Sequence, residues 1–72
     1  MTRGDMVLVN DYLRSGVDGS VPNVGIITCV HGDGTVNVKV LADVSPAYDA
    51  EAIAAFDADP GLMEGRYCYP AD

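Results

Sequence analysis

The segment 35–41, with the sequence TVNVKVL, constrains the fold of this chain more than any other stretch. Its valines stand at every second position and would point to one face, with Asn37 and Lys39 on the other. This period of two is typical of a half-buried strand in an antiparallel sheet. The preceding run 24–30, VGIITCV, is also apolar and β-branched, so the two segments predict a β-hairpin.

The residues between the two segments, His31-Gly32-Asp33-Gly34, include the only histidine and invite a chemical interpretation. Asp33 and Gly34 suit the two central positions of a tight hairpin turn, where both residues need a positive φ angle. Gly32 adds backbone freedom just before them. We therefore predict a turn made by Asp33 and Gly34, which leaves only His31 without a structural role.

The spacing of apolar residues changes after residue 45 and predicts a short helix over residues 46–57. Ser45 suits its N-cap and Pro46 its first helical position. Spacings of four, one and three residues would give one apolar stripe, formed by Tyr48, Ala52, Ile53 and Phe56. Such a stripe would be either a lid over a core or a surface for a partner.

The order of the elements predicts a small barrel. Residues 6–10 and 65–70 resemble further strands, and residues 11–23, rich in Gly, Ser, Asp and Pro, resemble a long loop. A sheet of so few strands must close or cover its edges. We therefore predict a mainly β, SH3-like barrel over residues 1–72 as a single domain, with the helix plugging one end. A chain of this size buries only about 60% of the surface that it exposes when unfolded, so the core should be thin.

The charge balance argues against one class of partner. Eleven acidic residues outnumber four scattered basic ones, which gives a formal net charge of −7. Binding to a nucleic-acid backbone needs clustered Lys and Arg, so we predict none. The acidity would serve solubility, a basic partner or imitation of DNA. No apolar run approaches the roughly 18 residues of a membrane span, and the N-terminal segment lacks the apolar core of a signal peptide, so we expect a cytosolic chain that binds no membrane.

Reactive side chains are few and form no recognisable catalytic or metal-binding pattern. Cys29 and Cys68 lie in apolar runs and are expected in the core as free thiols, although neighbouring strands would permit a disulfide. A metal site needs about three or four ligands in a compact arrangement, which one histidine and two distant cysteines do not supply. Cys29 and His31 would share a face, but no oxyanion loop accompanies them. We predict no catalytic residue, no metal and no cofactor.

Two tyrosines give the main candidate for a contact surface. Tyr67 and Tyr69 are two apart in the last predicted strand, so they should share a face opposite Cys68. Paired tyrosines can stack a ligand or anchor a partner, or they can fill a core with their hydroxyls at its rim. Together with Arg66 and His31, they are the candidate residues for contact with a partner or ligand.

Several short motifs of the chain resemble a group of small bacteriophage proteins of SH3-like type. In that group, a Gly-Asp-x-Val strand and a variable polar loop precede a pattern like Pro-Ala-x-Val-x-x-Val, which is followed by a short turn and Val-Asn-Leu-x-Val-Phe-x-Asp. The matching residues here are Gly4-Asp5, Pro22, Val30, Val36-Asn37-Val38 and Asp43. Val38 and Leu41 replace the usual Leu and Phe, and residues 45–62 have no counterpart. The resemblance implies a phage protein without established enzyme activity, and it transfers no catalytic residue.

Two functional hypotheses follow from the sequence. The first is a non-enzymatic interaction module that serves as a virion accessory, decorating the capsid or associated with the tail. Its partners would be other phage structural proteins or copies of itself. The second is an anti-defence protein in the host cytoplasm, which sequesters a nucleotide signal or blocks a host defence protein. Nucleotide capture would require Arg66, Tyr67, Tyr69 and His31 to converge, against a net charge of −7.

Overall fold

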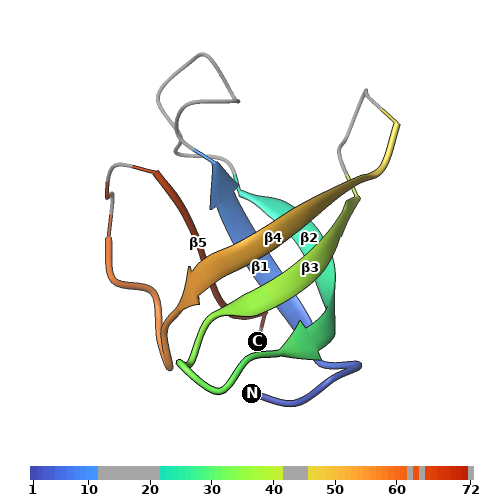
Figure 1. The fold of residues 1–72 in the computed structure, drawn as a ribbon. Helices are drawn as coiled ribbons and strands as arrows, with labels where there is room; N and C mark the ends of the chain where they lie inside the picture. The colour runs from blue at the N-terminus through green and yellow to red at the C-terminus, as the bar shows by residue number, and fades with distance from the viewer. Residues whose placement is uncertain (12–21, 42–45, 62, 64, 72) are drawn as a thin grey trace.

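The computed structural model describes residues 1–11, 22–41, 46–61, 63 and 65–71, and in this part of the chain five strands form a closed barrel (Figure 1). The strands are β1 (Met6–Asp11), β2 (Asn23–Val30), β3 (Val36–Leu41), β4 (Tyr48–Ala55) and β5 (Arg66–Pro70). They follow one another around the barrel in chain order, and β5 returns to pair with β1. The predicted mainly β barrel is therefore confirmed.

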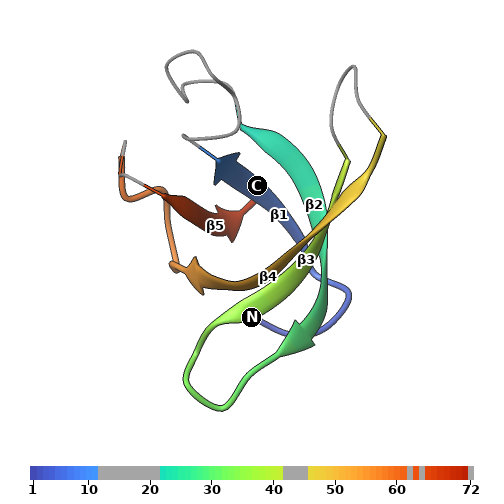
Figure 2. The same cartoon turned by 45° about the horizontal axis from the view of Figure 1, so that its top comes forward.

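Strand pairing is antiparallel everywhere except between β4 and β5, which run parallel. Figure 2 shows β1 between β5 and β2, so the first and last strands lie side by side. The parallel pairing is short and joins only Ala54 to Tyr67 and Ala55 to Cys68. This short contact closes the barrel.

The core consists of the inward positions of all five strands. Val36, Val38 and Val40 of β3 are each no more than 1% exposed, while Lys39 between them is exposed, as the alternation predicted. The other buried core residues are Val7, Val9, Ile27, Ala50, Ile53 and Cys68. Gly25 leaves room for them, because a Cβ atom there would collide with Val38 and lie 3.1 Å from Val9 Cγ2.

The predicted helix over residues 46–57 is wrong, because this segment forms strand β4 between β3 and β5. Ser45, its predicted N-cap, lies outside the described residues, as does most of the predicted loop over residues 11–23. Ala-rich segments have little intrinsic preference for a strand, so here the pairing with β3 decides the conformation.

A β-bulge in β4 explains the apparent helical spacing. Val36 pairs with Ile53 and Val38 with Ala50, so β4 holds one residue more than β3 over the same distance. Ala50 and Ile53 therefore both point into the core, although they are three positions apart. At the bulge, Ala52 has a φ of 52°, in the left-handed region that non-glycine residues rarely adopt.

A second bulge lies in β2, on the other side of β3. Ile27 pairs with Val38 but Cys29 pairs with Asn37, so β2 also holds one extra residue. The extra residue reverses the alternation, and Cys29 is exposed instead of buried as predicted. Cys68 is buried, and both cysteines are free. Since β2 and β5 each pair with β1 and not with each other, the disulfide that neighbouring strands would permit does not form.

Candidate functional site

The turn between β2 and β3 contains Asp33 and Gly34 but has three residues in its loop, not two. The His31 N–H donates to the Thr35 carbonyl oxygen at 2.8 Å, and the Gly34 N–H donates to the His31 carbonyl oxygen at 3.1 Å. Gly34 has a φ of 91°, whereas Asp33 has no positive φ. This is a three-residue hairpin loop that ends in a left-handed glycine, in place of the expected turn with two positive φ angles.

Asp33 stabilises the turn through its carboxylate. Asp33 Oδ1 accepts hydrogen bonds from the Thr35 hydroxyl at 2.7 Å and from the Thr35 N–H at 2.9 Å. These bonds, the hydroxyl first, hold the pKa of the Asp33 carboxyl below its usual value, because they favour the charged form. Asp33 therefore acts as a turn residue and not as a proton donor.

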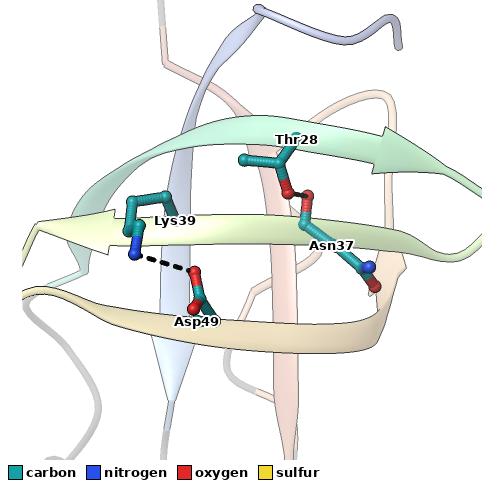
Figure 3. Close-up of polar contacts among 4 residues, drawn as sticks. All are labelled: Thr28, Asn37, Lys39 and Asp49. Atoms are coloured by element: carbon teal, nitrogen blue, oxygen red, sulfur yellow. Dashed lines mark hydrogen bonds and ion pairs between the residues drawn. The ribbon is translucent and has the colours of Figure 1, made fainter.

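Asn37 connects the two bulges and gives His31 a structural role. Asn37 Oδ1 accepts a hydrogen bond from the Ala52 N–H at 2.8 Å and lies 2.8 Å from His31 Nε2. Because Ala52 N–H can only donate, the atom facing it must be the amide oxygen, and His31 Nε2 must therefore carry a proton. At the bulge of β2, the Thr28 hydroxyl donates to the backbone carbonyl oxygen of Asn37 at 3.3 Å (Figure 3).

Tyr67 and Tyr69 lie on the face of β5 opposite Cys68, but they are covered. Their rings stack with centroids 6.3 Å apart, and Phe56 meets Tyr67 edge-on at 6.0 Å. The Tyr67 hydroxyl donates to the Gly61 carbonyl oxygen at 2.7 Å, so the segment 56–61 closes over the pair. Only 2% of Tyr67 and 8% of Tyr69 are exposed. The two rings therefore fill a small apolar cluster outside the barrel wall and present no open contact surface.

The same covering affects the pKa of the Tyr69 hydroxyl. Burial raises the pKa of its hydroxyl above the usual value, and the nearby Asp59 carboxylate raises it further. Asp59 also accepts a hydrogen bond from the Gly61 N–H at 2.9 Å, which fixes the covering segment.

Arg66 and His31 lie at opposite ends of the barrel. Arg66 pairs with Asp11, near the start of β2, and its guanidinium lies 5.8 Å from the centroid of the Tyr48 ring. His31 follows the last residue of β2, and a strand of eight residues is roughly 25 Å long. The structure therefore does not bring the four candidate contact residues into one site.

An apolar surface that the sequence pattern did not predict lies on the outside of β1, β2 and β3. Met6 pairs with Ile26, Leu8 with Val24, and Val24 with Leu41. Leu8 is half-buried, while Met6 is 59%, Leu41 48%, Ile26 39% and Val24 38% exposed. We call these five residues the outer apolar face. Contiguous exposed apolar side chains of this kind mark interaction sites on soluble proteins.

The outer apolar face contains almost no charge. Strands β2 and β3 contain no acidic residue, and Lys39 is their only charged residue. Lys39 Nζ lies 3.1 Å from Asp49 Oδ1 on the neighbouring strand β4 (Figure 3). A signal for this face was present in the run VGIITCV, where the solvent-facing Val24 and Ile26 are apolar instead of the polar residues expected in a half-buried strand.

An open pocket of about 470 Å³ adjoins this face at Met6. It is lined by Met1, Asp5, Met6, Val7, Pro70 and Ala71. Asp5 is its only ionisable side chain, and Asp5 Oδ2 already accepts a hydrogen bond from the Thr2 N–H at 2.9 Å. That bond lowers the pKa of the Asp5 carboxyl, so Asp5 itself is no general acid near neutral pH.

Comparison with known proteins gives no relative: no family model, curated protein or solved structure matches the chain significantly. Among the described residues, no group of three or more His, Cys, Asp or Glu side chains could hold a metal ion. Within the same residues, no helix has the length and apolar character needed to cross a membrane. The candidate site is therefore defined by the geometry of the outer apolar face alone.

Proposed function

We propose that this chain is a non-enzymatic protein-interaction module with an SH3-like barrel, and that it serves a phage as a virion accessory on the capsid or tail. The observation that carries the proposal is the outer apolar face, which exposes Met6, Val24, Ile26 and Leu41 on adjacent strands. The phage assignment is supported by the motifs Gly4-Asp5 and Val36-Asn37-Val38, which resemble small phage proteins of SH3-like type.

The chemistry of the face favours a protein partner. An apolar centre with few charges is typical of the fully buried part of a protein interface, where charged residues are depleted. The face covers paired strands and has no cluster of cations that would bind a phosphate group. The surrounding acidic residues keep the chain soluble until the face is covered.

Nucleotide capture by a single copy has less support. Arg66, on β5, lies near the start of β2, whereas His31 follows the end of β2. The rings of Tyr67 and Tyr69 are covered. The charge of −7 also opposes an anionic ligand. The remaining form of the anti-defence hypothesis, blocking a host defence protein, would use the same outer apolar face.

Quantitative peptide mass spectrometry on purified phage particles tests the proposal. Particles are prepared with the wild-type chain, with Ile26→Asp on the outer apolar face, and with Ala54→Asp on the exposed side of β4 as a matched control. Circular dichroism first establishes that both variants fold. We expect the wild type and Ala54→Asp to be present at the same number of copies per particle, and Ile26→Asp to be absent from the particles.

Absence of the wild-type chain from particles, with abundant chain in infected cells, would overturn the virion assignment in favour of the anti-defence hypothesis. Equal incorporation of both variants would overturn the assignment of the outer apolar face as the binding surface.

A further inference from the structure

We infer that the outer apolar face binds a second copy of the same chain, in a dimer whose two-fold axis runs along β2. This inference rests on the proposed function, because it assigns the partner of the same face. The dimer would be the form in which the chain attaches to a larger assembly.

The distribution of charge selects a second copy as the partner. The chain carries 11 acidic residues and a net charge of −7, so most contacts between two copies would bring like charges together. The outer apolar face is the exception, since β2 and β3 contain no acidic residue and Lys39 is beside Asp49. A two-fold interface must be complementary to itself, and an apolar face without net charge meets this condition.

The strand register places the axis. Leu8 on β1 and Leu41 on β3 are both register partners of Val24 on β2, so they lie on either side of it. A two-fold axis along β2 therefore puts Leu8 of one copy over Leu41 of the other. Val24 then meets Val24, and Ile26 meets Ile26.

The same axis also accommodates Lys39, the charged residue that adjoins the outer apolar face on β3. Met6 and Lys39 are both register partners of Ile26, so Met6 of one copy would lie over Lys39 of the other. The aliphatic stem of Lys39 can cover Met6 while its ammonium group stays on Asp49 of its own chain. No charge is then buried without its partner.

The size of a standard interface sets how much of each copy the dimer would cover. A standard interface buries about 800 Å² per partner. The accessible surface of the chain is 4467 Å², so such an interface would cover less than a fifth of it. The outer apolar face, with the adjoining pocket at Met1 and Met6, would form the apolar centre of that interface.

Sedimentation equilibrium over a range of protein concentrations tests the dimer. We expect reversible dimerisation of the wild type, at least a tenfold higher dissociation constant for Ile26→Asp, and a wild-type constant for Ala54→Asp. Added sodium chloride should strengthen the association, because it screens the repulsion between two acidic chains. A wild type that stays monomeric at millimolar concentration, or equal weakening by both variants, would overturn the inference.

Cysteine cross-linking tests the axis. In a Cys29→Ser background, Ile26→Cys should form a disulfide-linked dimer under mild oxidation, because residue 26 meets its own copy. Ala54→Cys, which is exposed on β4, should not, and Cys68 is buried and does not react. Equal cross-linking at positions 26 and 54, or none at 26 in a dimeric protein, would overturn the placement of the axis.

Sedimentation equilibrium and the mass spectrometry of particles together separate failure of this inference from failure of the proposed function. A monomeric wild type whose Ile26→Asp variant is still lost from particles overturns the second copy as partner and leaves the interaction module intact. A dimer that Ile26→Asp abolishes, without loss from particles, overturns the role of the face in the virion and leaves the dimer intact.

Discussion

Asn37 satisfies two donors with one side-chain oxygen, and the donors come from different parts of the barrel. The Ala52 N–H lies at the bulge of β4, where the pairing with β3 is interrupted, and Asn37 Oδ1 replaces the missing ladder partner. His31 Nε2 donates to the same oxygen from the β2–β3 turn. The histidine that looked chemical in the sequence thus has a role in holding the turn against β3.

Replacing Asn37 with Ala should lower the free energy of unfolding by about 1–3 kcal/mol, because the Ala52 N–H and His31 lose their acceptor. Lys39→Ala is the matched control on the same strand and the same side. Within one copy it removes only an exposed ion pair, with side chains 47% and 63% exposed, and at concentrations where the chain is monomeric it should cost about 0–1 kcal/mol. Urea unfolding followed by circular dichroism measures both values, and equal losses would contradict the role given to Asn37.

At the scale of the elements, two wrong predictions have one cause. Both predictions assume that a strand alternates without a break, which places Cys29 in the core and makes residues 46–57 look unlike a strand. One extra residue in each strand shifts the phase of the alternation on both sides of Asn37. A bulge depends on the curvature that closes the barrel, which a local pattern does not contain.

The features that could be predicted were those fixed by local chemistry. Strands β1, β2 and β3 follow from β-branched runs, and β5 follows from its two tyrosines between Gly65 and Pro70. Gly34 supplies the left-handed residue of the turn. The shared face of Tyr67 and Tyr69 follows from the period of a strand. Their covering by segment 56–61 could not be predicted, because it depends on contacts outside the strand pattern, such as the hydrogen bond from the Tyr67 hydroxyl to the Gly61 carbonyl oxygen six residues away.

Because of the bulge in β4, replacing alanine with glycine should change the stability in opposite directions at positions 52 and 54. Ala52→Gly should stabilise the protein by about 0.5–1 kcal/mol, because it relieves a left-handed alanine with a φ of 52°. Ala54→Gly, in ordinary strand conformation, should destabilise it by about 0.5–1 kcal/mol. Thermal unfolding of each variant and of the wild type measures both changes in stability. Destabilisation by Ala52→Gly would count against the bulge.

At the scale of the whole molecule, the inner surface of the barrel and the cluster of Tyr67 and Tyr69 are covered within a single copy, whereas the outer apolar face is not. The inner surface holds valines of β1 and β3 that are no more than 1% exposed. The outer apolar face remains accessible on a chain whose other exposed surface carries most of its acidic residues. A thin core gains stability from any partner that binds only the folded state.

The buried thiol of Cys68 makes the stability of the whole barrel sensitive to alkaline pH. Burial raises its pKa from 9.0 to about 11, so the unfolded chain ionises first. The stability is therefore complete below about pH 9 and falls as the pH rises towards 11, by roughly 2–3 kcal/mol in total. Urea titrations at several pH values should show this loss in the wild type and a shallower loss in Cys68→Ala. Parallel pH profiles for the two proteins would contradict the assignment.

The pairing of the first and last strands also decides how the barrel responds to tension. Val7 and Pro70 form the end of the β1–β5 ladder nearest to both termini, and the Ala71 N–H donates to the Met6 carbonyl oxygen at 3.3 Å. In an antiparallel pair, a pull on these two ends loads one rung of the ladder at a time. The β1–β5 pair would therefore separate from this end at low force, one pair of residues after another. A load applied across the outer apolar face would act on several strands together.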